Sequence, residues 1–267
     1  MSNLSHRFDY PKKSLGQHFL VNKGVLRKIV ESADIKSGDT VVEIGPGTGL
    51  LTELILARCE NVVLIELDVD LVDDLKVKFR EYSNIRVIHA DARSWVPDLE
   101  RRSYKLLGNL PYYAANPIMR NFLESERPPS RMYLTLQKEV ADSIVAAKGK
   151  MRILSVAVQA YGRPRILGQI RPGSFFPPPK VMSSIVEIDV FDEPVFNLGE
   201  TDSFFGIVRA GFGSRRKQLK NSLARYSGLN GQDLELVFNE AKIPSTTRAQ
   251  DLDIDDWVRL HEIIKHK

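Results

Sequence analysis

Apolar and polar positions along the first two thirds of the chain predict strands and helices in regular alternation. Short β-branched runs, such as VVEI at 41–44 and NVVLIE at 61–66, are typical of buried strands. Residues 22–33, 50–59 and 69–82 instead space apolar side chains as an amphipathic helix does. Further strands are predicted at 84–92, 104–113 and 131–137, with a helix at 116–125. This order is typical of βαβ units and a parallel sheet with helices on both faces.

The pattern changes in the last third of the chain. RPRILGQI and SSIVEIDVF read as strands on either side of a proline-rich loop, GSFFPPPKV. After Asp192 the spacing is helical, over residues 201–212, 215–226, 232–241 and 253–265. We therefore predict a Rossmann-like α/β domain over residues 1–193 and a small all-helical domain over residues 194–267.

Composition limits the classes of protein that fit. Of the 267 residues 43% are apolar and 27% charged, as in a soluble globular protein. The single cysteine, Cys59, excludes a disulfide scaffold and a cysteine-rich zinc site. No apolar stretch approaches the roughly 18 residues of a membrane span, and no secretory signal is evident. We expect a cytoplasmic, monomeric protein that does not associate with membranes.

Positive charge is gathered in a few segments. The net charge is +4, and GRPRILGQIRPG and GSRRKQLKNSLAR hold many of the lysines and arginines. Clustered cations with aromatic residues nearby indicate a polyanionic partner such as nucleic acid.

Glycines follow the first predicted strand of the α/β domain. Gly45, Gly47 and Gly49 allow a tight turn and close approach of a ligand to the backbone. Their spacing differs from the Gly-x-Gly-x-x-Gly of dinucleotide folds, which argues against a pyrophosphate at the helix N-terminus. Glu43, just before the turn, suits either a ligand ammonium or a structural role.

Acidic residues end the next two predicted strands. Glu66 can accept hydrogen bonds from ribose hydroxyls. Asp91 can accept from an adenine amino group, with the Ala92 amide near the ring. Because ligands of parallel sheets bind at the carboxyl ends of the strands, these groups should meet. A ribose and adenine site without a pyrophosphate site predicts S-adenosylmethionine as cofactor.

The fourth predicted strand ends in Asn109-Leu110-Pro111-Tyr112. The exocyclic amine of a nucleobase is a poor nucleophile, because its lone pair is delocalised into the ring. The Asn109 side-chain oxygen and the Leu110 or Pro111 carbonyl can accept its two N–H groups and localise that lone pair. Tyr112 can stack on a flipped base. Catalysis then rests on in-line alignment of nitrogen, methyl and sulfur.

Other chemistries lack their motifs. Neither Gly-x-Ser-x-Gly nor a Walker A sequence is present. Cys59 is remote from the predicted site, so thiol-dependent methylation of pyrimidine carbon is not expected. The histidines, at positions 6, 18, 89, 261 and 266, show no metal-ligand spacing, and we expect no metal.

Taken together, SLGQHFL, EIGPGTGLLT, IELD, ADA, GNLPYY, FFPPPKV and FGSRRKQLKNSL resemble the KsgA (RsmA) family of rRNA adenine dimethyltransferases. The resemblance spans nearly the whole chain in the same order. It implies dimethylation of N6 on two adjacent adenines in the terminal hairpin loop of small-subunit (16S) rRNA. The partner that it implies is the assembling 30S subunit.

The resemblance also implies roles for individual residues. His18 and Leu20 resemble residues that close over the cofactor, Gly45 and Gly47 its methionine-side contacts, and Asn109 completes that site. Glu66 and Asp91 resemble the ribose and adenine contacts. Phe175 and Phe176 resemble the aromatic part of the target-base pocket, opposite Tyr112. The chain departs from the family pattern at His18, Tyr113 and Ala114, which leaves details of the substrate loops open.

A basic cluster at the start of the predicted helix 215–226 is the predicted RNA contact. It consists of Arg215, Arg216, Lys217 and Lys220, which we expect within two turns of one helix. Such a cluster would bind phosphates, while the shape of a structured loop selects the RNA.

Three alternatives remain at this stage. An Erm-like enzyme would dimethylate one adenine of large-subunit rRNA with a similar catalytic motif. A relative without catalysis would bind nucleic acid on the same fold. A DNA adenine methyltransferase is a weaker third, because no recognition domain of adequate size is apparent.

Overall fold

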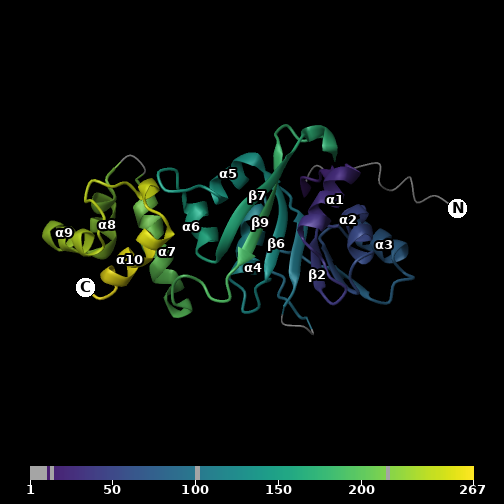
Figure 1. Ribbon diagram of the computed structural model, residues 1–267, viewed down its shortest axis with the longest axis horizontal. Helices are drawn as coiled ribbons and strands as arrows, with labels where there is room; N and C mark the ends of the chain where they lie inside the picture. Colours follow the sequence, from purple (N-terminus) through teal and green to yellow (C-terminus); the bar gives the residue numbers. More distant parts are fainter. Residues whose placement is uncertain (1–10, 13–14, 100–102, 215–216) are drawn as a thin grey trace. The chain divides into compact units, whose positions relative to one another are not determined.

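Alternating strands and helices fill the first part of the chain and helices the last (Figure 1). The computed structural model describes residues 11–12, 15–99, 103–214 and 217–267. The strands are β1 (Phe19–Leu20), β2 (Thr40–Ile44), β3 (Asn61–Glu66), β4 (Ile85–His89), β5 (Lys105–Asn109), β6 (Arg131–Gln137), β7 (Gly162–Ile170), β8 (Phe175–Phe176) and β9 (Ser183–Val190). The α-helices are α1 (Lys23–Ser32), α2 (Leu50–Leu56), α3 (Val69–Lys78), α4 (Ala115–Leu123), α5 (Lys138–Ile144), α6 (Ile153–Gln159), α7 (Thr201–Phe212), α8 (Leu219–Ser227), α9 (Gly231–Glu240) and α10 (Ile254–Ile264). Short 3-10 helices within the described residues include η3 (Pro172–Ser174), η4 (Leu198–Glu200) and η5 (Ala249–Asp251).

The main sheet has the order β4-β3-β2-β5-β6-β9-β7. Strands β2 to β6 pair in parallel with their neighbours, and β9 runs antiparallel to β6. The predicted α/β class is confirmed. The chain moves outward from β2 through β3 to β4 and then returns to the other side of β2 with β5. Such a reversal of strand order is where α/β sheets place their ligand crevice.

Both faces of the parallel strands β2, β3, β5 and β6 are buried over most of their length, whereas the edge strand β4 is partly exposed. Val41, Leu64 and Leu107 belong to the apolar core on one face, which also takes side chains from α1 and α2. Val42, which alternation turns to the opposite face, is equally inaccessible. A strand buried on both sides reads as a continuous apolar run, which is why these strands were recognisable in the sequence.

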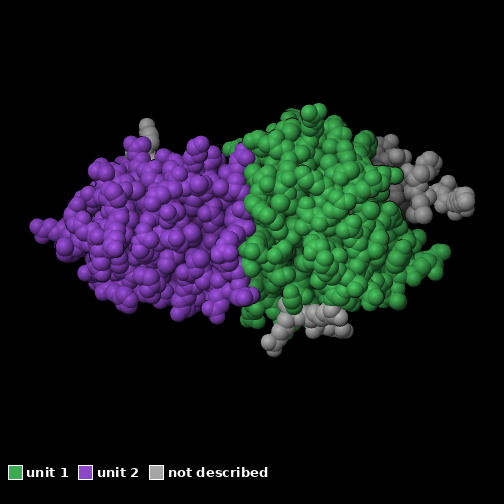
Figure 2. All heavy atoms as spheres, viewed as in Figure 1, with its two compact units in different colours: residues 1–141, 165–190 green, residues 142–164, 191–267 purple. Residues whose placement is uncertain are grey.

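The chain forms two compact units, coloured separately in Figure 2. The first comprises residues 1–141 and 165–190, and the second residues 142–164 and 191–267. Residues 142–164 were predicted to belong to the first domain, and helix α6 within them was not predicted. The assignment of catalytic and RNA-binding roles to two domains stays a prediction.

The second unit has an aromatic core of its own. Phe196 stacks on Phe204 with ring centroids 4.6 Å apart, and Phe212 stacks on Trp257 at 5.5 Å. The predicted helix at 215–226 begins later than expected, at Leu219. The reason is tertiary: the Leu219 amide donates to the carbonyl of Thr247 at 2.8 Å, outside any helical ladder.

Within the described residues, no helix combines the length and the apolar character that crossing a bilayer requires.

Candidate active site

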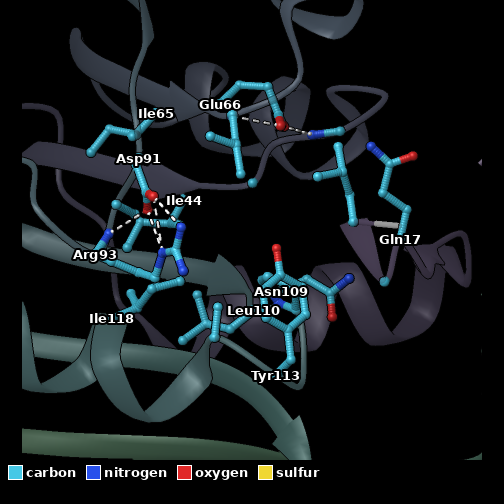
Figure 3. Close-up of a pocket in the computed structure, with 18 of the residues that line it drawn as sticks. Gln17, Ile44, Ile65, Glu66, Asp91, Arg93, Asn109, Leu110, Tyr113 and Ile118 are labelled. Atoms are coloured by element: carbon cyan, nitrogen blue, oxygen red, sulfur yellow. Dashed lines mark hydrogen bonds and ion pairs between the residues drawn. The ribbon is translucent and has the colours of Figure 1, made fainter. Parts of the chain in front are cut away.

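A cavity lies at the carboxyl ends of β2, β3, β4 and β5 in the first unit (Figure 3). Segment 15–19 also lines it, so residues far apart in the sequence converge there. Of the predicted site residues, the lining includes His18, Gly45, Gly47, Glu66, Asp91, Ala92, Asn109, Leu110, Pro111 and Tyr112. The topology thus brings the predicted cofactor groups and the predicted catalytic tetrapeptide to one place.

The glycine turn after β2 has a backbone that other residues rarely adopt. Gly45, Gly47 and Gly49 have φ of 62°, 56° and 75°. A β-carbon at Gly47 would lie 2.8 Å from the ring of Phe19, so a side chain there would collide with the N-terminal segment. The turn therefore presents bare backbone to the cavity, as a closely held ligand requires.

Glu66 ends β3 with its carboxylate fixed toward this turn. Its side-chain oxygens accept from the amides of Leu67 at 2.8 Å, Asp68 at 3.0 Å and Gly47 at 3.3 Å. The residue is 7% exposed, and this burial raises its pKa. A carboxylate offers about four lone-pair sites, so a further donor can still be accepted. The remaining acceptor site fits one ribose hydroxyl, and a second hydroxyl would share an oxygen that already accepts an amide.

Glu43 is buried one residue before the end of β2. Its Oε2 accepts from the Thr52 hydroxyl at 2.7 Å, and burial, with Glu66 nearby, raises its pKa to about 8. It lines a smaller neighbouring cavity together with Asn109 and the buried hydroxyl of Thr135. Glu43 therefore has the contacts of a structural acid of the glycine turn.

Asp91 lies after β4 and is bound by Arg93. The guanidinium Nε donates to Oδ1 at 3.0 Å and to Oδ2 at 2.9 Å, and Nη2 donates to Oδ2 at 2.5 Å. The Arg93 amide donates to Oδ1 at 2.9 Å. This pairing lowers the pKa of Asp91 and keeps it ionised. Figure 3 shows the pair at one side of the cavity. An adenine amino group that donated to Asp91 would therefore share the carboxylate with Arg93.

The Asn109 amide has a defined orientation. Its Nδ2 donates to the carbonyl of His18 at 2.7 Å. Oδ1 consequently faces away from that carbonyl, and no described residue donates to it. The Pro111 carbonyl accepts from the Ala114 amide at 3.0 Å, whereas the Leu110 carbonyl has no such partner in the described chain. The structure therefore favours Asn109 and Leu110 as the pair of acceptors.

His18 joins the tetrapeptide to the proline-rich loop. Its ring stacks on Tyr112 with centroids 5.7 Å apart, and Nδ1–H donates to the Pro177 carbonyl at 2.7 Å. The Tyr112 hydroxyl is hydrogen-bonded to Ser183 at 2.7 Å, and its pKa is raised by burial. One face of Tyr112 is thus already occupied by His18.

The two phenylalanines predicted for the base pocket differ in environment. Phe175 is 4% exposed and belongs to the hydrophobic core, whereas Phe176 is 52% exposed. Strand β8 pairs Phe175 with Leu20 and Phe176 with Phe19, and neither phenylalanine lines the main cavity. Leu20 is buried and lines the smaller cavity. Of the two rings, Phe176 is the one available to a nucleobase.

Only half of the predicted basic cluster falls within the described residues. Arg215 and Arg216 lie outside them. Lys217 precedes α8 in a turn, and Lys220 lies in its first turn. The Lys220 ammonium is 2.5 Å from the Glu235 carboxylate, so its charge is already paired. The expectation that all four residues share one helix was wrong, because α8 begins at Leu219.

Several lining residues were not predicted as site residues. Gln17, Leu67, Arg93, Tyr113 and Ile118 all line the cavity. The first four each adjoin a predicted contact in the sequence, so their neighbours gave a local signal for them. Ile118, in α4, has no such neighbour, and only the fold brings it to the cavity.

The chain is similar to known proteins over nearly its whole length. A model of the family described as ribosomal RNA adenine dimethylase matches residues 9–266. Ribosomal RNA small subunit methyltransferase A of Dehalococcoides mccartyi (strain CBDB1) is 42% identical over 252 residues, which are 93% of this chain and 87% of the relative. Its counterpart in Clostridium botulinum (strain Kyoto / Type A2) is 38% identical over 257 residues, with 94% and 93% covered.

Solved structures give the same fold. A dimethyladenosine transferase from Plasmodium falciparum superposes with a TM-score of 0.79 at 26% identity, over 91% of this chain and 96% of that one. The 23S rRNA methyltransferase ErmE superposes with a TM-score of 0.75 over 92% and 99%, at 24% identity. At that identity the likeness to ErmE concerns the fold alone.

Proposed function

Because the chain belongs to the ribosomal RNA adenine dimethylase family, we propose that it dimethylates N6 of two adjacent adenines in the terminal hairpin loop of small-subunit rRNA, with S-adenosylmethionine as methyl donor. One observation carries the proposal: the carboxyl ends of four strands bring Glu66, the glycine turn and Asn109-Leu110-Pro111-Tyr112 to one cavity. The cofactor supplies an electrophilic methyl group. The chain supplies its binding site and the acceptors for the amine.

The cavity residues divide the work of binding. Glu66 would accept from the ribose hydroxyls, and its three amide contacts hold the carboxylate in place for them. The bare backbone at Gly45 and Gly47 would lie along the methionine part of the cofactor. Asp91, or the Ala92 amide beside it, would contact the adenine.

The tetrapeptide would activate the target amine. Asn109 Oδ1 and the Leu110 carbonyl would accept its two N–H groups, which turns the nitrogen lone pair toward the methyl group. The His18 carbonyl fixes the amide that carries Oδ1, so little reorientation is needed at the moment of transfer. Once methylated, the amine becomes acidic and loses its proton to solvent, so a strong base is unnecessary.

The target adenine would stack on aromatic rings at the cavity mouth. Tyr112 is covered on one face by His18 and offers the other to the base. Exposed Phe176 is the second candidate ring. Base–aromatic stacking contributes on the order of 1–3 kcal/mol per base, enough to offset part of the cost of unstacking the target.

The large-subunit alternative is less well supported. The relatives at 38–42% identity carry the name ribosomal RNA small subunit methyltransferase A, while ErmE is 24% identical. An assembling small subunit as partner, a monomeric state and a cytoplasmic location complete the proposal.

The test uses the full-length enzyme with radiolabelled S-adenosylmethionine and undermethylated ribosomal subunits. We expect label in dimethyladenosine from small-subunit rRNA and none in large-subunit rRNA. Label confined to the large subunit would favour the Erm-like alternative. Cofactor binding without transfer to either RNA would favour a non-catalytic relative.

A further inference from the structure

A cluster of possible metal ligands lies in the second unit, apart from the residues discussed so far. Glu200 ends η4, while His261 and Glu262 lie in α10. Nδ1 of the His261 imidazole is 4.0 Å from a Glu200 carboxylate oxygen and 3.8 Å from one of Glu262. His261 is fully buried, whereas the Glu262 side chain is 45% exposed, so solutes reach the cluster from the Glu262 side.

Ser203 determines which imidazole nitrogen carries the proton. Its hydroxyl donates to the backbone carbonyl of Glu200 at 3.0 Å. With that single proton on the Glu200 carbonyl, the 2.8 Å contact between the hydroxyl oxygen and His261 is donated by Nε2–H. Nδ1 is then the nitrogen with the free lone pair. A metal-binding histidine is typically oriented by a hydrogen bond of this kind from its other nitrogen.

The Nδ1 lone pair lacks a donor. It is buried and has no hydrogen-bond partner among the described residues. It faces two carboxylates, so three electron-rich groups converge at one point.

Lys265 shows that a cation is already bound by these carboxylates. Its ammonium lies 2.6 Å from Glu262 and 3.0 Å from Glu200. An ammonium can only donate, so it satisfies the acids. The structure gives it no hydrogen bond to Nδ1, which a metal ion would engage as a third ligand.

We propose that Glu200, His261 and Glu262 form a binding site for a divalent transition-metal ion of the Zn²⁺ type, in competition with the Lys265 ammonium. The three ligand atoms lie within 4.8 Å of one another. Zinc bonds to nitrogen and oxygen of about 2.0–2.2 Å require the two carboxylates to close in by roughly an ångström. One imidazole and two carboxylates suit Zn²⁺ better than Mg²⁺ or Ca²⁺, which prefer all-oxygen sites.

Such an ion would connect η4, directly before α7, to the last turns of α10. The proposal departs from the expectation of no metal, which considered only the spacing among histidines. Glu200 and His261 are sixty-one positions apart in the numbering, and only the fold brings them together.

The site is tested on the full-length protein after treatment with a chelator, by titration with Zn²⁺ in a calorimeter. Bound metal is then counted after equilibrium dialysis. We expect one ion bound by the wild type, loss of that ion in His261→Gln, and affinity more than about tenfold weaker in Glu262→Gln. Lys265→Met should bind Zn²⁺ more tightly because the competing cation is gone. Glu240→Gln, an exposed carboxylate on α9, and His266→Gln are the controls and should bind as the wild type does.

A ¹H–¹⁵N spectrum of the histidine rings identifies the ligand atom. Addition of Zn²⁺ should shift the Nδ1 signal of His261 and leave its Nε2 proton in place. His261 is buried, and its substitution can disturb folding. The variants at Glu262 and Lys265, which lie nearer the surface, therefore test the site independently of His261. Failure to bind Zn²⁺, unchanged affinity in both of those variants, or loss of binding in His266→Gln instead would overturn the proposal.

Discussion

Asn109, the proposed acceptor for the target amine, has a fixed orientation in the absence of substrate. Its amide nitrogen is held by the His18 carbonyl, which leaves the oxygen as an acceptor directed elsewhere. Among the neighbouring carbonyls, that of Pro111 is engaged by the Ala114 amide and that of Leu110 is not. The sequence left these two carbonyls equivalent, and the turn geometry distinguishes them.

Replacement of Asn109 by alanine should reduce methyl transfer by about a hundredfold or more, the usual scale for loss of one hydrogen bond made in the transition state. Cofactor affinity should fall only modestly. Asn109→Asp keeps an acceptor oxygen and should retain more activity than the alanine variant. Single-turnover rates and calorimetric cofactor titrations measure both effects. Near wild-type turnover in Asn109→Ala would rule out the amine-acceptor role.

Glu66 is expected to act mainly on cofactor binding. Charge-assisted hydrogen bonds contribute on the order of 1.5–3 kcal/mol, so Glu66→Ala should raise the cofactor dissociation constant about ten- to a hundredfold. The turnover of enzyme saturated with cofactor should change far less. Glu60→Ala, an exposed carboxylate just before β3, is the matched control. An unchanged dissociation constant in Glu66→Ala would contradict the ribose contact.

Glu43 predicts a dependence of stability on pH. Its pKa in the folded protein is about 8, against an ordinary value of 4.5. Between these values the unfolded chain releases the proton and the folded chain keeps it. Stability therefore falls as pH rises, by at most about 1.4 kcal/mol per pH unit from this group. Glu43→Gln has no ionisable group at this position and keeps an oxygen that can accept from Thr52. The free energy of unfolding of the variant, relative to that of the wild type, should therefore increase from pH 5 to pH 8. Parallel curves in urea titrations would show that Glu43 is not protonated.

The strands position the candidate site residues through the points at which they end. Strands β3 and β5 end at the candidate site residues Glu66 and Asn109, and β2 ends directly before Gly45. The parallel pairing of β2 with both neighbours brings those ends together. Pairing of β8 with β1 likewise determines the burial of two adjacent phenylalanines, because successive side chains of a strand point to opposite faces. Phe175 enters the core and Phe176 faces outward.

The segment before α8 is the element on which RNA affinity is predicted to depend. Arg215→Ala with Arg216→Ala should weaken rRNA binding and lower the slope of log K against log salt by about 0.7–0.9 for each phosphate that is no longer neutralised. Lys36→Ala is the control, because this lysine lies in the first unit, outside the predicted cluster, and its ammonium is paired with Asp34. Filter binding at several salt concentrations measures both slopes. A slope unchanged in the double variant would count against the assignment, and cofactor affinity should be the same throughout.

At the scale of the whole molecule, the division into two units implies that a substitution can lower the stability of one unit and leave that of the other unchanged. Asp256 is buried in the second unit, where it accepts from Lys148 at 2.6 Å and from Arg259. Although burial raises the pKa of Asp256, the hydrogen bond from Lys148 and the other donors lower it overall. This contact ties residues 142–164 to α10.

Asp256→Asn should lower the free energy of unfolding of the second unit by about 1 kcal/mol, because the buried carboxylate loses its charge-assisted hydrogen bonds from the half-exposed Lys148 and Arg259. Trp95 lies in the first unit and Trp257 in the second, so variants that retain a single tryptophan report on each separately. We expect the Trp257 transition to move to lower urea and cofactor affinity to stay constant. Equal displacement of both transitions would show that the units unfold together.

Much of the fold was predictable because its signals are local. A strand buried on both faces reads as an apolar run, and a glycine turn reads as glycines. The short helix α6, the start of α8 and the separation of residues 142–164 were not predictable, because each depends on contacts with distant segments. The ion pair between Asp91 and Arg93 is a similar case. Both residues can be read from the sequence, but their contact cannot.

The sequence by itself determined the α/β class, the family and the order of the chemical groups along the chain, since these are carried by residue type and spacing. Only the tertiary structure decided which atoms of those groups are available. The orientation of Asn109, the choice of Leu110 over Pro111, the exposure of Phe176 over Phe175 and the meeting of Glu200 with His261 all depend on neighbours remote in sequence. Hydrogen bonds and burial act over a few ångströms, and only folding determines which residues come that close.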